Sequence, residues 1–238
     1  LTQWKLRMGV KGMAIRPDLI AGAAPADPEA DKGTLNDIAR QAMDAAEGRA
    51  GANYGTAFHQ FAQRLDAGEP LEALKAPPPL DADLAAYSEC MQRQQLKVVA
   101  MEKIVVLPEL GIAGRFDRIV EQPVSKDLGS DKPYSIMDLK SGKTVEFGWL
   151  EICIQQALYA HAGWMYDPAT KAYERMPDVD KDRALIMHSP IGQAHPRLYA
   201  IPILKGWKWV QLAMQVREAR SGARRRGFAW LVQPDDKD

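Results

Sequence analysis

The sequence has little cysteine, no long hydrophobic run and no excess of either charge. Cys90 and Cys153 are the only cysteines among 238 residues, and neither belongs to a C-x-x-C pattern. Two isolated thiols fit a reducing compartment and are too few for a cysteine-only zinc site. No apolar run approaches the roughly 20 residues that span a bilayer, and the start lacks a signal-peptide pattern. We therefore expect a cytoplasmic protein without a membrane partner.

The charges balance overall but not locally. Lysine plus arginine and aspartate plus glutamate number 31 each, so only a local patch could attract nucleic acid. Residues 217–226 carry five arginines against one glutamate, and Arg217, Arg220 and Arg224 fall on one helical face. This stripe is a candidate for binding DNA phosphates, and a solvated helix face is the alternative.

A phosphate-binding loop is also missing. Gly142, Lys143 and Thr144 match the end of G-x-x-x-x-G-K-[ST], but Met137 stands where the first glycine belongs. We therefore expect no nucleotide cofactor.

The composition, 46% hydrophobic and 26% charged, is that of a globular protein with a full core. Periodicity predicts an α/β fold in which residues 1–97 form a helical part and residues 98–238 a core, together making one structural domain. The expected helices cover residues 4–20 with breaks at Gly9, Gly12 and Pro17, then 34–48, capped by Thr34, 54–65, 81–96, opened by Asp81 or Asp83, 146–165 and 206–223. The expected strands are a hairpin of 103–107 and 111–120, then 134–140, 183–188 and 197–203.

Two acidic residues and a lysine are the first candidates for chemistry. Asp138 and Lys140 are two positions apart on one expected strand, so both side chains leave the same face. If the strand carrying Asp117 is its neighbour, two carboxylates meet. Such a pair repels unless a cation lies between its members, and oxygen ligands suit Mg²⁺ or Mn²⁺. Taken alone, a D-x-K pattern is typical of an ordinary salt bridge at a sheet edge.

Two helical patterns accompany these residues. His59 lies one turn after Gly55, and Gln155 lies one turn before Tyr159 on the same face. Taken singly, His59 is typical of a structural histidine, and Gln155 and Tyr159 are typical of the border of a packed helix.

The order of the four patterns is more specific. G-x-x-x-H at 55–59, G-x-x-D at 114–117, D-x-K at 138–140 and Q-x-x-x-Y at 155–159 resemble the PD-(D/E)XK nuclease superfamily. Within it they are similar to the RecB-like exonuclease branch, which includes the nuclease of CRISPR adaptation and relatives encoded by tailed bacteriophages. Residues 4–8, 16–19 and 52–59 look most like the phage members. The resemblance implies a mixed central sheet flanked by helices, with a helical N-terminal extension.

The same resemblance implies a role for each matching residue. Asp117, Asp138, His59 and the backbone carbonyl of Leu139 would bind the metal, and Lys140 would assist the attacking water. Gln155 and Tyr159 would support the active site. A glutamate upstream of G-x-x-D is frequent in this branch, and Glu102 and then Glu109 are the candidates.

One feature departs from the branch, because several members carry four cysteines for an iron–sulfur cluster. With two cysteines, this chain is expected to bind Mg²⁺ or Mn²⁺ and no such cluster. The implied function is metal-dependent DNA exonuclease activity in phage replication or recombination, with a recombinase or replication protein as a candidate partner. The alternatives are a structure-specific endonuclease, such as a junction resolvase, and a DNA-binding module without turnover.

Overall fold

The computed structural model describes residues 2–46, 50–124 and 131–226. The chain divides into two compact units, Leu1–Gln60 and Phe61–Asp238. The division falls within helix α4 (Ala50–Asp66), earlier than the boundary at residue 97 drawn from the sequence. Within the described ranges, no helix is long and apolar enough to cross a membrane.

The first unit is helical, as expected, with α1 (Thr2–Ile15), α2 (Pro17–Ala23), α3 (Lys32–Ala45) and most of α4. Leu19, Ile38 and Ala42 bury their side chains together and join α2 to α3.

Two expectations for these helices were wrong in detail. Gly9 and Gly12 do not interrupt α1, because a helical glycine costs only about 1 kcal/mol relative to alanine. The break occurs before Pro17, which lacks a backbone N–H and takes the first helical position. Helix α3 begins at Lys32, after Asp31, so Thr34 lies inside it and does not cap it.

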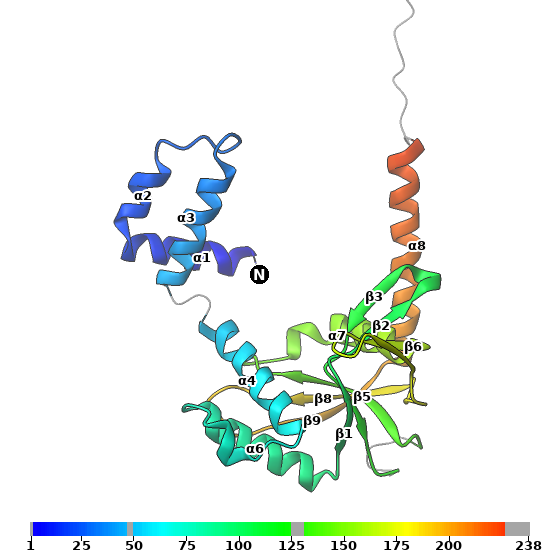
Figure 1. Ribbon diagram of the computed structural model, residues 1–238. Coiled ribbons are helices and arrows are strands. Elements are labelled where there is room, and N and C mark those ends of the chain that lie inside the picture. Colours follow the sequence, from blue (N-terminus) through cyan, green and yellow to red (C-terminus); the bar gives the residue numbers. More distant parts are fainter. Residues whose placement is uncertain (1, 47–49, 125–130, 227–238) are drawn as a thin grey trace, which may run out of the picture. The chain divides into compact units, whose positions relative to one another are not determined.

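The second unit contains two sheets (Figure 1). The five-stranded sheet has the order β1-β4-β5-β8-β9, and the four-stranded sheet has the order β3-β2-β6-β7. The strands are β1 (Lys97–Met101), β2 (Ile104–Leu107), β3 (Ile112–Arg115), β4 (Arg118–Glu121), β5 (Tyr134–Lys140), β6 (Trp164–Asp167), β7 (Ala172–Arg175), β8 (Arg183–His188) and β9 (Arg197–Pro202). The five-stranded sheet is mixed, because β5 and β8 run parallel while its other pairs are antiparallel.

The expected hairpin is present, but it is shorter than predicted. Strands β2 and β3 pair antiparallel around the short 3-10 helix η1 (Pro108–Leu110). The run 111–120 then divides, because β3 belongs to one sheet and β4 to the other. The sequence predicted Asp117 on the second strand of the hairpin. In the structure it lies instead at the junction between β3 and β4.

The helices of this unit also differ from expectation at their ends. Helix α6 (Leu80–Arg93) follows Pro79, so neither Asp81 nor Asp83 caps it. The buried Asp83 carboxylate instead accepts hydrogen bonds from the backbone N–H groups of Gly192 and Ala194.

The helix expected over 146–165 ends earlier. After the 3-10 helix η2 (Glu146–Gly148), α7 (Trp149–Ala160) ends before β6. Strands β1, β6 and β7 and the short helix α5 (Leu71–Leu74) were not predicted from the sequence.

Helix α7 packs against β5 and against the last helix, α8 (Leu204–Arg226). At the crossing of the two helices, a Cβ on Gly206 would lie 2.3 Å from the Cys153 carbonyl oxygen, so only glycine permits this approach. The Cys153 side chain is buried here as a small core residue, as expected, and burial raises the pKa of its thiol.

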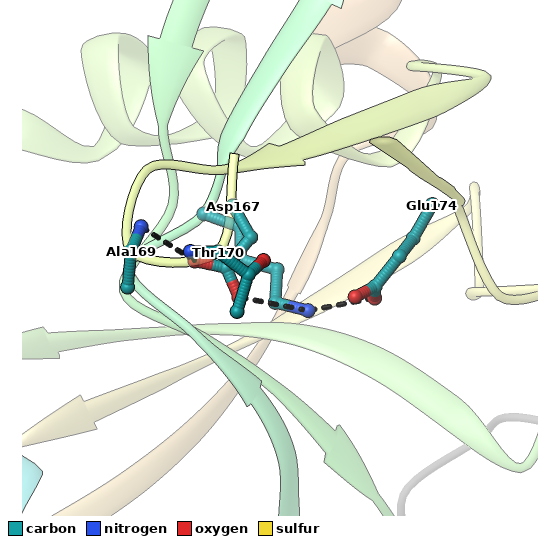
Figure 2. Close-up of polar contacts among 5 residues, drawn as sticks. Asp167, Ala169, Thr170 and Glu174 are labelled. Carbon is teal, nitrogen blue, oxygen red and sulfur yellow. Dashed lines mark hydrogen bonds and ion pairs between the residues drawn. The ribbon is translucent and has the colours of Figure 1, made fainter. Parts of the chain in front are cut away.

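The turn between β6 and β7 gathers charged groups that pair with one another (Figure 2). Asp167 Oδ1 accepts hydrogen bonds from the backbone N–H groups of Ala169 and Thr170. Lys103 Nζ lies 2.6 Å from Glu174 Oε2 and 3.7 Å from Asp167 Oδ2. These contacts fasten the turn to the four-stranded sheet.

Candidate active site

Asp117 and Asp138 lie level with each other on neighbouring chain segments. Arg118 of β4 pairs with Met137 of β5 in antiparallel register, so the next positions outward are Asp117 and Asp138. Residues opposite each other in an antiparallel pair share a face. Asp117 Oδ2 also accepts a hydrogen bond of 3.0 Å from the backbone N–H of Leu139. The condition set by the sequence, that the two segments be neighbours, is met.

Lys140 lies beside the same carboxylate. Its Nζ is 2.7 Å from Asp138 Oδ2, which agrees with the shared face predicted from their spacing. Asp138 is buried, whereas about a third of the Lys140 side chain remains exposed. The lysine therefore reaches from solvent to a buried carboxylate.

Burial and the charge of Asp117 raise the pKa of Asp138 to about 6, while Lys140 and the Gln156 amide act in the opposite direction. The ammonium of Lys140 therefore offsets only part of the cost of holding this carboxylate as an anion. Such a group gains from further positive charge close by.

Glu102 is a third carboxylate near this pair. Its backbone N–H donates to the Asp117 carbonyl at 3.1 Å, and its own φ of 52° lies in the left-handed region, which is unusual for a non-glycine residue. Burial, and next the charge of Asp117, raise the pKa of the Glu102 carboxyl. Glu109, the other candidate, lies exposed on η1. Glu102 is therefore the candidate glutamate that the structure joins to Asp117 by a backbone hydrogen bond.

Helix α7 brings Gln155 and Tyr159 toward the carboxylates. Gln155 Nε2 donates to the Tyr159 hydroxyl at 3.0 Å. Burial raises the pKa of Tyr159, and the charges of Asp138 and Asp117 add to the effect, which places the hydroxyl within their electrostatic range. The ring of Tyr159 lies against Gly114, where a Cβ would come within 2.6 Å of Cε1. The glycine of G-x-x-D therefore leaves room for the tyrosine of Q-x-x-x-Y.

Two expected metal ligands are not placed by these contacts. His59 lies on α4 within the first unit, whereas the carboxylates belong to the second unit. Leu139 is on β5 next to Asp138, and its N–H is taken by Asp117. The roles of His59 and of the Leu139 carbonyl stay predictions.

The arginine stripe lies on α8, at the edge of a groove between α7 and α8. Arg217 and Arg220 are exposed, and one Arg217 Nη1–H donates to the Leu110 carbonyl at 3.3 Å. The side chain of Arg224 lies outside the part that the structure describes. The groove is mainly apolar, lined by Leu150, Ile154, Trp209, Leu212, Ala213, Val216, Arg217, Arg220 and Ser221.

A buried polar network beside Asp117 was not predicted from the sequence. Arg118 points to the sheet face opposite Asp117, and its Nε lies 2.6 Å from Asp66 Oδ2. The hydroxyl of Tyr87 lies 3.0 Å from both oxygens of Asp66. The network ties α4 and α6 to the start of β4, and only tertiary contacts define it.

The oxygen donors of Asp117 and Asp138, with Glu102 close by, match the chemistry of Mg²⁺ or Mn²⁺. Magnesium is usually held by one or two carboxylates and completes its shell with water. Among the described residues, no group of three or more histidine, cysteine, aspartate or glutamate side chains forms a ready-made metal cage. Asp117 and Asp138 supply oxygen donors of the kind that Mg²⁺ or Mn²⁺ prefers.

A scan against models of known protein families and a search of curated proteins both found no match to this chain.

Proposed function

We propose that this protein is a metal-dependent deoxyribonuclease, most simply an exonuclease of the PD-(D/E)XK type. The observation that carries the proposal is the grouping of Asp117 and Asp138 on neighbouring segments, with Lys140 Nζ 2.7 Å from Asp138. The α/β fold with a mixed five-stranded sheet is compatible with such a core.

Asp117 and Asp138 would hold the cation, with Glu102 as an additional carboxylate beside Asp117. Bound there, Mg²⁺ or Mn²⁺ would stabilise the negative charge that develops on the phosphoryl oxygen and lower the pKa of a water. Because Asp138 is buried and its pKa is raised to about 6 by burial and Asp117, a cation would also favour its ionised form.

Lys140 is the residue best placed to orient the attacking water. Its ammonium is partly exposed and lies next to the carboxylate pair, so it can contact both solvent and a bound phosphate. Tyr159, held by Gln155, borders the same site and can hydrogen-bond a phosphate oxygen.

The proposal of exonuclease activity, as opposed to endonuclease activity, depends on His59. In the branch that this chain resembles, a histidine before the D-x-K strand accompanies degradation from DNA ends. A neutral imidazole is a good ligand for a divalent cation, and it would close one side of the site. We therefore expect His59→Ala to be strongly impaired on linear DNA.

The test is to incubate the purified chain with end-labelled linear duplex and with covalently closed circular DNA. We expect linear DNA to be shortened in Mg²⁺ or Mn²⁺, the closed circle to resist, and excess EDTA to stop the reaction. Efficient nicking of the circle, or normal digestion by His59→Ala, would instead favour a structure-specific endonuclease. DNA binding without cleavage of either substrate would indicate a module without turnover and refute the proposal.

A further inference from the structure

Gln156 is a fully buried glutamine on α7, between the two residues assigned to the Q-x-x-x-Y pattern. Neither its Nε2 nor its Oε1 has a hydrogen-bond partner within the part of the chain that the structure describes. An unpaired buried amide is costly, and such groups are uncommon in folded proteins. A leucine or methionine would fill this position at lower cost, so the polar side chain calls for an explanation.

Asp138 is the candidate partner for the Gln156 amide. Cys153, Ala157 and Ala160, on the same stretch of α7, are buried in the apolar core. Gln156 lowers the pKa of the buried Asp138 carboxyl on β5, the strand against which α7 packs. The amide and the buried carboxylate therefore lie close enough to interact, without a hydrogen bond between them in this structure.

The neighbouring glutamine, Gln155, has a different partner. Gln155 is only half-buried, and its amide already donates to Tyr159. Consecutive helical residues point about 100° apart, so Gln155 and Gln156 cannot serve the same partner. Of these two glutamines, Gln156 is therefore the one available to interact with Asp138.

The behaviour of Lys140 explains why the Asp138 carboxylate would need a second partner. Its Nζ lies 2.7 Å from Asp138 Oδ2, so a lysine that turns toward water or phosphate must give up this contact. The buried carboxylate would then lose the cation of its ion pair. A small movement of the Gln156 amide would let its N–H replace the lysine.

Resting on the proposed nuclease function, we propose that Gln156 is a positioning residue that holds the Asp138 carboxylate when Lys140 leaves it. Gln156 donates an N–H to Asp138 and keeps the carboxylate oriented toward Asp117. It touches neither substrate nor reacting atoms.

The test compares Gln156→Met with the parent, because methionine has a similar length and no polar atoms. The matched control is Gln122→Leu, since Gln122 is also buried with an unpartnered Oε1 but follows the far end of β4. The measurements are the midpoint of urea unfolding, the affinity for Mn²⁺ by isothermal titration calorimetry, and kcat and KM on linear DNA.

For Gln156→Met we expect an unfolding midpoint equal to or above the parent's, because an unpaired amide has been removed. We expect Mn²⁺ affinity to weaken and kcat to fall about 10- to 100-fold at an unchanged KM for DNA, as for a lost hydrogen bond to a charged group. Gln122→Leu should keep the parent's Mn²⁺ affinity and kcat.

Parental kcat and Mn²⁺ affinity in Gln156→Met would overturn the inference, as would losses that only parallel a loss of stability. A parent that neither binds Mn²⁺ nor cleaves DNA would refute the proposed function itself, and this inference with it.

Discussion

The ring of Tyr159 occupies the space beside Gly114 that a side chain would need, because a Cβ at Gly114 would lie 2.6 Å from Tyr159 Cε1. This contact joins β3 of the four-stranded sheet to α7, which packs against the five-stranded sheet. The glycine and the tyrosine are therefore structurally coupled although 45 positions separate them.

Replacing Gly114 by alanine should displace Tyr159 and destabilise the protein. Overpacking of this kind typically costs about 1–3 kcal/mol, because a rigid ring cannot yield without moving its helix. The free energy of urea unfolding measures the effect. Gly163→Ala is the control, since a Cβ at Gly163 meets no atom within 4 Å. Equal stabilities for the two variants would show that Tyr159 is not held by this contact.

The buried ion pair between Asp66 and Arg118 makes a second prediction. Asp66→Ala should lower the free energy of unfolding by about 3–5 kcal/mol, because it leaves the Arg118 guanidinium buried without its partner. The double variant Asp66→Ala with Arg118→Met should be less destabilised than Asp66→Ala alone. The exposed pair of Arg64 and Glu69 is the control, and Glu69→Gln should leave the stability at the parent's value. A double variant less stable than Asp66→Ala would contradict this account.

The arginine stripe predicts a change in the salt dependence of DNA binding. Replacing Arg217, Arg220 and Arg224 together by alanine should weaken binding to all sequences. The slope of log K against log salt should flatten by roughly 2–3, at about 0.9 per lost phosphate contact. Fluorescence anisotropy over a range of salt concentrations measures the slope. An unchanged slope would identify the stripe as a solvated face.

His161 predicts a dependence of stability on pH. Its ring stacks on Trp207 at 4.0 Å between centroids, and its Nδ1–H donates to the Ala157 carbonyl. Burial lowers the pKa of His161 below its ordinary 6.5, so the folded state keeps the ring neutral while the unfolded chain takes up a proton. This contribution to stability is complete above about pH 6.5 and is lost as the pH falls toward the folded-state pKa.

His161→Gln should therefore flatten the slope of the unfolding free energy against pH below about 6.5. Urea titrations at several pH values measure it. A slope equal to the parent's would show that His161 does not contribute.

The sequence predicted the strands whose pattern is local and missed those that depend on pairing. Strand β5 was predicted to the residue, because a short apolar run is bounded by Pro133 and by Ser141 and Gly142. Strand β1 was not predicted, because it begins at Lys97, immediately after the end expected for the preceding helix. The division of 111–120 between two sheets has no local signal, since it depends on which strands pair with β3 and β4.

For the candidate site, too, the sequence predicted the local relationships and not those that depend on tertiary packing. Spacing two apart placed Asp138 and Lys140 on one face, and their ion pair agrees with it. The hydrogen bond between Asp117 and Glu102 and the burial of Gln156 arise from tertiary packing, which no spacing rule contains. His59 belongs to the first unit, whereas the carboxylates belong to the second.

The most direct test of the central claim is the rate of DNA cleavage by Asp138→Ala under single-turnover conditions in Mg²⁺ or Mn²⁺. Lys143→Ala serves as the control, because Lys143 is exposed in the loop after β5. We predict that Asp138→Ala binds linear DNA but loses several decades of cleavage rate, as expected for a residue that holds a catalytic cation, while Lys143→Ala cleaves at the parent's rate. Cleavage by Asp138→Ala at the parent's rate would contradict the account.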